Sequence, residues 1–136
     1  MISLLIFILA SICSASMDKC QFHYEKSVFT VFENPSYWNS DVSWENKYID
    51  RDFKKGMRKC LWGLFDYPVL LTDFWHLMKS SMIALMVLSI VFYEPTLSYF
   101  NFGLCQPILW IFDFILFGIA WNLVFNLFFN RILAKR

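Results

Sequence analysis

The chain has 136 residues, of which 58% are hydrophobic, 21% are aromatic and only 17% are charged. This composition excludes an intrinsically disordered protein, which has low hydrophobicity and high net charge, and it argues against an ordinary soluble domain, in which about 25% of residues are charged. The formal net charge of +1 gives no reason to expect a nucleic-acid partner, because binding to a phosphate backbone needs clustered excess cations.

The charges are distributed unevenly along the chain. Residues 1–17 carry none, residues 18–79 carry nine acids and nine bases, and residues 80–130 carry only Glu94 and Asp113. The chain therefore has an apolar start, a polar middle and a long apolar end. This pattern predicts an all-α membrane protein with about three transmembrane helices and a small aromatic-rich juxtamembrane segment between the first and the second.

The first apolar stretch, residues 1–17, has the shortest length that can cross the hydrocarbon, for which about 17–25 residues are needed. A small-x-small string at residues 14–16 resembles a signal cleavage site, but no basic residue precedes Asp18. We therefore expect a retained transmembrane anchor rather than a cleaved signal peptide. Residues 18–67 form the polar, aromatic-rich juxtamembrane segment, which is small for an independent core and is expected to lie against the membrane or the helices.

The second span is expected at residues 68–94 and has a semi-polar start. Pro68 fits the first turn of a helix, where its missing N–H costs little. Glu94 precedes a proline and is therefore pushed out of the helical region, which ends the helix. The remaining segments are expected to be a loop at 95–103, a third span at 104–130 and a basic tail at 131–136.

Basic residues flank the expected spans on one side. Two lysines follow the first span, four bases precede the second, and three bases follow the third. Cytoplasmic flanks are enriched in Lys and Arg. Three retained spans would therefore place residues 18–67 and the C-terminus in the cytoplasm and the N-terminus outside. We expect a multi-pass protein of a cytoplasmic membrane, with the lipid bilayer as its main partner.

Several short strings occur in a spaced combination over about residues 1–80. They are Phe22-His23-Tyr24, Asn34-Pro35 with Trp38-Asn39, Ser43-Trp44-Glu45-Asn46-Lys47-Tyr48, and Thr72-Asp73-Phe74-Trp75-His76. This combination resembles a family of small bacterial membrane proteins with the pattern FHY, NPxxWN, SWxNKY and TDxWH. The resemblance implies a bacterial membrane location and no particular activity. The basic stretch at residues 54–59 departs from the family, which is richer in Pro and Gly there.

Asp73 and His76 are three residues apart and would share one face of the second helix. An ionisable residue at the membrane edge is costly unless it is paired or hydrated, so the pair is a candidate site. Asp73 could orient the imidazole of His76, whose other nitrogen would serve as a base or metal ligand, and His23 could join them. The alternative is a structural network between helices. The spacing matches no metalloenzyme signature, so the sequence assigns no metal ion and no cofactor.

A basic run lies next to aromatic residues before the second span. Lys54, Lys55, Arg58 and Lys59 precede Trp62. Basic residues beside an aromatic one suit an anionic leaflet, where each base contributes about 1 kcal/mol near the surface. The run predicts contact with the membrane surface. The alternative is that it only determines the topology of the chain and binds no lipid.

The third span carries two polar features. Gly118, Asn122 and Asn126 recur every four residues and form one seam, which is typical of helix contacts in lipid. Asp113 lies on roughly the opposite face. A charged residue within a span is either a proton or ion relay or is paired, in this chain with Lys79 or with a hydroxyl group in the bundle.

These patterns support three hypotheses about function. The leading one is a small integral membrane protein with a non-catalytic structural or assembly role, which packs with itself as a homo-oligomer or with another membrane protein. The second is a membrane-embedded enzyme or metal site that uses His23, Asp73 and His76. The third is a small oligomeric channel or transporter centred on Asp113.

Overall fold

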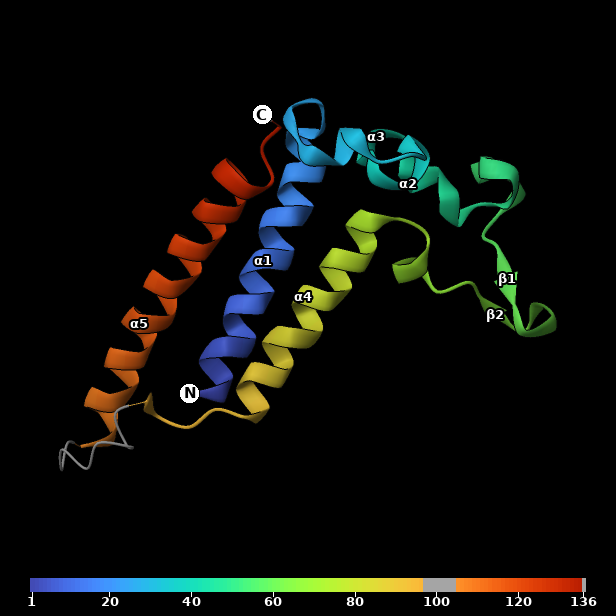
Figure 1. Ribbon diagram of the computed structural model, residues 1–136. Coiled ribbons are helices and arrows are strands. Elements are labelled where there is room, and N and C mark those ends of the chain that lie inside the picture. The colour runs from blue at the N-terminus through green and yellow to red at the C-terminus, as the bar shows by residue number, and fades with distance from the viewer. Residues whose placement is uncertain (97–104, 136) are drawn as a thin grey trace.

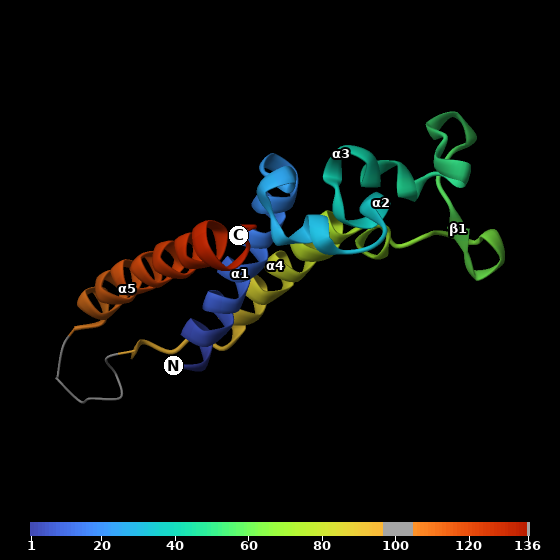
Figure 2. The same ribbon diagram turned by 45° about the horizontal axis from the view of Figure 1, so that its top comes forward.

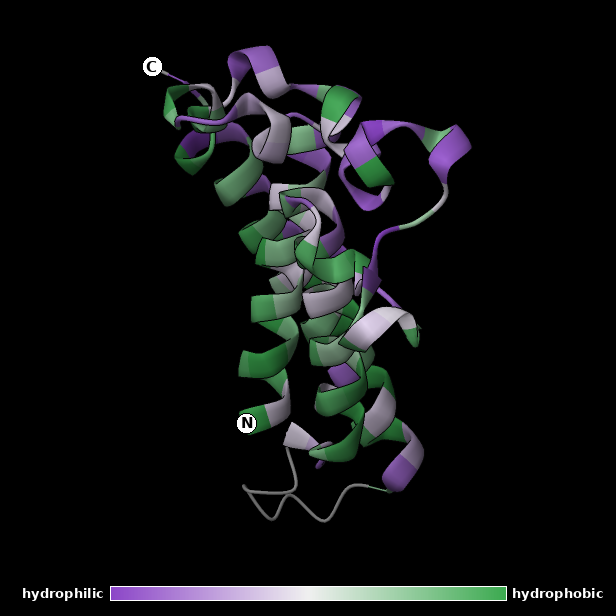
Figure 3. Ribbon diagram, turned by 90° about the vertical axis from the view of Figure 1, so that its right-hand side faces the viewer, coloured by the Kyte–Doolittle hydropathy of each residue, from purple (hydrophilic) through white to green (hydrophobic). Residues whose placement is uncertain are grey.

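The computed structural model describes residues 1–96 and 105–135. It confirms an all-α membrane protein, because three helices in these ranges are long and apolar enough to cross a membrane. Figure 1 and Figure 3 show these helices side by side, with the more polar part of the chain gathered mainly at one end. The three helices are α1 (Ile2–Phe22), α4 (Phe74–Val91) and α5 (Gln106–Leu127), the last of which continues as a π-helical turn over Phe128–Ile132.

Helices α1 and α4 form a close antiparallel pair. The hydroxyl of Ser89 donates to the carbonyl oxygen of Ser3 at one end (3.0 Å), and the Trp75 indole donates to the side-chain oxygen of Gln21 at the other (2.8 Å). The contact is close because small side chains let helix backbones approach each other in a membrane protein. The small buried residues of α1 are Ser3, Ala10, Ser11, Ala15 and Ser16.

Helix α5 packs on a different face of α1. The Phe7 ring lies 5.2 Å from the Phe117 ring and 5.0 Å from the Trp121 ring. Helix α1 is therefore the central one. Of its most apolar stretch of 18 residues, 33% is buried inside the molecule, against 11% for the corresponding stretches of α4 and α5. The outer faces of α4 and α5 are left apolar and exposed, as contact with lipid requires.

The C-terminal tail returns to the segment that follows α1. The Val28 amide donates to the Leu133 carbonyl oxygen (3.1 Å), and the Lys135 amide donates to the Lys26 carbonyl oxygen (2.9 Å). Figure 2 places the C-terminus beside the blue segment at the end of α1. The polar middle of the chain and its C-terminal tail therefore lie at the same end of the helix bundle.

The polar middle consists of short elements around an aromatic cluster, which comprises Phe29, Phe32, Trp38 and Phe74. Phe29 is only 4% exposed, and its ring stacks on Trp38 at 5.7 Å and lies 4.9 Å from Phe74, the first residue of α4. The cluster joins the middle segment to the bundle. The short elements are α2 (Pro35–Trp38), α3 (Ser40–Ser43), β1 (Lys59–Cys60), β2 (Phe65–Asp66) and 3₁₀ turns over Tyr24–Lys26, Val28–Val31, Trp44–Lys47, Ile49–Arg51, Phe53–Lys55, Leu61–Gly63 and Val69–Leu71.

The helix boundaries differ from those predicted. Helix α1 continues past residue 17 to Phe22. Helix α4 begins at Phe74 instead of near Pro68, because Asp73 is extended and its side chain caps the helix. The residues between Pro68 and Asp73 form a separate 3₁₀ turn. Most of the loop predicted at 95–103 lies outside the described residues.

Candidate functional site

Asp73 and His76 form a hydrogen-bonded pair in the first turn of α4. The Asp73 carboxylate is 1% exposed. One of its oxygens accepts from the His76 backbone amide (2.9 Å), while the other accepts from the Thr72 hydroxyl (2.9 Å) and lies 2.6 Å from His76 Nδ1. An ionised carboxylate can only accept, so Nδ1 carries the hydrogen and the basic nitrogen of the ring is Nε2.

The pair lies in a cleft of about 200 Å³, called here the polar cleft. Helix α4 contributes His76 and Trp75 to its lining, the last turn of α1 contributes Gln21, and the segment around α3 contributes Ser43 and Trp44. The side chain of His76 is 23% exposed, so its ring is accessible from the cleft.

Contacts with the middle segment hold the residue that precedes Asp73. The Asn46 amide donates to the carbonyl oxygens of Ser36 (2.6 Å) and Thr72 (3.1 Å), and so joins α2 to the residue before Asp73. Burial and the nearby Asp73 carboxylate raise the pKa of Tyr37, which keeps that phenol neutral.

The structure does not bring His23 to this pair. The His23 ring packs edge-on against Phe129 of the π-helical turn at 5.4 Å, and the Lys19 ammonium lies 4.7 Å from the same Phe129 ring. Helix α1 ends at Phe22, and His23, the next residue, therefore does not join Asp73 and His76 as the sequence suggested. Within residues 1–96 and 105–135, no group of three His, Cys, Asp or Glu side chains is placed to hold a metal ion.

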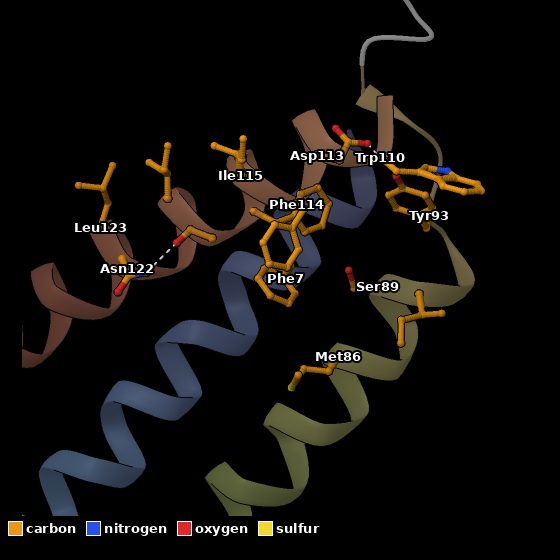
Figure 4. A pocket seen from close by; sticks show the side chains of 14 residues that line it. Phe7, Met86, Ser89, Tyr93, Trp110, Asp113, Phe114, Ile115, Asn122 and Leu123 are labelled. Carbon is orange, nitrogen blue, oxygen red and sulfur yellow. Dashed lines mark hydrogen bonds between the residues drawn. The ribbon is translucent and has the colours of Figure 1, made fainter. Parts of the chain in front are cut away.

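Asp113 lies in a second and larger cleft of about 870 Å³ between α1, α4 and α5, called here the apolar cleft. Figure 4 shows Asp113 and Tyr93 at one end of this cleft and Asn122 and Leu123 toward the other. Asp113 is 3% exposed, and one carboxylate oxygen accepts from the Tyr93 hydroxyl and the Thr96 amide, both at 2.9 Å. The other oxygen is buried without a partner in the described part of the chain.

The partner of Asp113 is thus a hydroxyl group, one of the two alternatives left by the sequence. Lys79, the other alternative, lies near the start of α4, where its ammonium sits 4.7 Å from the Trp75 ring centre. Tyr93 could not be assigned from the sequence, because it meets Asp113 only through the antiparallel arrangement of α4 and α5. The same holds for Gln21 in the polar cleft, which comes from another helix.

The Gly118–Asn122–Asn126 seam is exposed within one chain. The Asn122 amide donates to the Gly118 carbonyl oxygen (2.9 Å), and the Asn126 amide donates to the Asn122 carbonyl oxygen (2.8 Å). These amides are bonded to their own helix and to neither α1 nor α4 in the described residues. The seam is available to a partner outside the chain.

The basic run lies on an exposed part of the middle segment that also carries β1 and β2 and is called here the arm. Lys55 pairs with Asp50 (2.8 Å), which lowers the pKa of Asp50, and Lys59 pairs with Asp66 (2.5 Å). Arg58 donates to the carbonyl oxygen of Tyr48 (3.1 Å). Lys54 lies 6.0 Å from the ring of Phe53. Part of the basic charge is therefore neutralised within the arm.

The tip of this arm is a hairpin of β1 and β2 with an apolar turn. Trp62 is 99% exposed, Leu64 is 75% exposed and Phe65 is 61% exposed. Figure 1 shows the hairpin well to the side of the bundle, with its turn lower in the view than the start of α4. Trp and other apolar side chains at this level suit the membrane interface.

A spin label at position 62 (Trp62→Cys in a background without the natural cysteines) should report the membrane phase. We expect electron paramagnetic resonance to find it more accessible to oxygen than to a water-soluble nickel complex, because oxygen partitions into lipid. A label at Lys55→Cys is the control and should give the reverse order. A preference for nickel at both positions would contradict insertion of the hairpin turn.

No family model, curated protein or solved structure matches the chain. The features of the chain that bear on its function are the two clefts, the exposed seam and the apolar hairpin turn.

Proposed function

We propose that this small multi-pass membrane protein has a non-catalytic assembly role and associates with a second copy of itself along α5. The observation that carries the proposal is the exposed seam, of which Gly118 and Asn122 also line the apolar cleft. A helix of a second chain would lie along this stripe.

The polar groups of the seam give the association its driving force. Asn122 uses one N–H on its own helix, and its side-chain oxygen has no partner in the described residues. The hydrocarbon contains no water that could satisfy such a group. A neighbouring helix can supply a donor, and an interhelical hydrogen bond contributes about 0.6 kcal/mol on average in a membrane.

Gly118 supports the same conclusion on steric grounds. A Cβ atom built at Gly118 would meet nothing within 4 Å, so the packing of one chain does not require a glycine there. Glycine and asparagine at a spacing of four residues allow close approach of a second helix. The glycine is therefore explained by a neighbour rather than by the fold of the single chain.

Gly118→Leu should reduce self-association while the single chain folds normally, because the added side chain fills the space of the second helix. The measurement is energy transfer between donor-labelled and acceptor-labelled protein in liposomes, over a range of protein-to-lipid ratios. Leu127→Trp is the control, because Leu127 is exposed on α5 and does not line the apolar cleft. Equal energy transfer in the wild type and both variants, or a monomeric wild type at every ratio, would refute the proposal.

The same proposal includes a location. The basic residues of the middle segment and the tail lie at one end of the bundle, which supports a cytoplasmic position for both and an outside position for the N-terminus. The resemblance to small bacterial membrane proteins supports a bacterial cytoplasmic membrane. The lipid bilayer is then the main partner of the exposed faces of α4 and α5.

A further inference from the structure

The polar cleft lies at the end of the bundle away from Asp113. It contains the side chains of Asp73 and His76, which have no part in self-association along α5. We infer that it is an ester-hydrolysing site, in which His76 acts as a general base on water and Asp73 positions the imidazole ring. The inference goes beyond the assembly role and does not depend on it.

The first support is the fixed geometry of the Asp73–His76 pair. The Asp73 carboxylate is held by the His76 backbone amide and the Thr72 hydroxyl, and it lies 2.6 Å from Nδ1 of the ring. The imidazole therefore cannot turn without breaking a hydrogen bond to a buried carboxylate. Its Nε2 is kept as the acceptor, which is the form that a general base needs.

The second support is a hydrogen-bond donor in the same cleft. The Trp75 indole can only donate, so the Gln21 atom that faces it at 2.8 Å is the amide oxygen. The NH₂ group of Gln21 consequently points elsewhere, and it has no partner in the described residues. Gln21 also lines the polar cleft. A donor at this place can stabilise the negative oxygen that develops when a carbonyl carbon is attacked.

The charges of the cleft define the substrate class. Its charged lining residues in the described chain are the carboxylates of Asp41 and Asp73, and no Lys or Arg side chain lines it. An anionic substrate would be repelled. Besides the segment around α3, the lining includes the last turn of α1 and the first turn of α4, where the apolar spans end. The substrate that fits is a neutral acyl ester of a membrane amphiphile, with its carbonyl in the cleft.

The reaction is a simple hydrolysis. Nε2 of His76 takes a proton from a water molecule while the water oxygen bonds to the carbonyl carbon, and the carbonyl electron pair moves onto its oxygen near Gln21. The carbonyl bond then re-forms, the bond to the alcohol oxygen breaks, and His76 returns the proton to that oxygen. The products are a carboxylic acid and an alcohol. Water is the nucleophile, because no hydrogen bond joins Ser43 to His76 in the described residues.

The test uses the full chain in lipid nanodiscs with 1-monooctanoylglycerol as the probe and the release of octanoic acid as the readout. His76→Gln should lower kcat by about 100-fold or more, the lower end of what a general base contributes. His23→Gln is the control and should keep the wild-type rate, because His23 lies against Phe129, outside the polar cleft. An octanoyl ester of glycerol phosphate should be hydrolysed more slowly than the neutral probe.

Asp73→Asn distinguishes the role of Asp73 in orienting the imidazole ring from its role in starting α4. Asparagine caps a helix about as well as aspartate, so α4 should keep its start and the variant should unfold at the wild-type temperature. Its kcat should fall while KM stays unchanged, because only the orientation of the ring is altered. A wild type no faster than His76→Gln would overturn the hydrolytic site, and an Asp73→Asn variant with the wild-type kcat would overturn the positioning role.

Discussion

Phe29→Ala should destabilise the polar middle of the chain by about 3–5 kcal/mol, the usual range for truncating a buried aromatic residue to alanine. Phe29 is 4% exposed and makes ring contacts with Trp38, Phe74 and Phe32. Its removal leaves a cavity between the middle segment and the first residue of α4. The effect should therefore reach Asp73, which caps that helix.

Hydrogen exchange of the backbone amides in detergent micelles measures this effect. In the Phe29→Ala variant we expect faster exchange over residues 28–47 and in the first turn of α4, while the apolar half of α4 keeps its protection. Phe32→Ala is the matched control, because Phe32 is 48% exposed and its truncation creates little cavity. Equal exchange in the two variants would mean that the aromatic cluster does not hold the middle segment on the bundle.

The spans could be predicted because the bilayer imposes a length on apolar stretches, and the stretches that end at Phe22, Val91 and Ile132 meet it. The predicted start of α4 was wrong because two residues in this region each favour a helix start. Pro68 suits a first helical position and Asp73 suits a cap. Asp73 prevails in the structure because its buried carboxylate also bonds Thr72 and the ring of His76, which local sequence alone does not weigh.

The candidate site was predictable only where it is local. Asp73 and His76 are three residues apart. This spacing brings the two side chains together whether the helix begins at Pro68 or directly after Asp73. The place of His23 depends on where α1 ends, and the exposure of Asn122 depends on which face of α5 meets α1. Both are decided by packing between helices, for which a single sequence carries no direct signal.

Asp113→Leu should destabilise the bundle by about 2–4 kcal/mol. The substitution leaves the Tyr93 hydroxyl and the Thr96 amide without the oxygen that they share. Both hydrogen bonds are partly buried, and a donor orphaned in a buried place costs about 1–3 kcal/mol. Loss of the second carboxylate oxygen, which is buried without a partner in the described residues, offsets part of this cost. The measurement is the free energy of unfolding in mixed micelles.

Asp113→Asn separates a structural role of this residue from an ion pathway. The carboxamide oxygen can accept both hydrogen bonds, so stability should stay within about 1 kcal/mol of the wild type. A relay would need an ionisable group at this position, so the assembly role predicts that proton flux through protein-containing liposomes is the same in the wild type and Asp113→Asn. A flux that is present in the wild type and lost in this stable variant would instead establish the channel hypothesis, because the carboxylate is then required for transport and not for the fold.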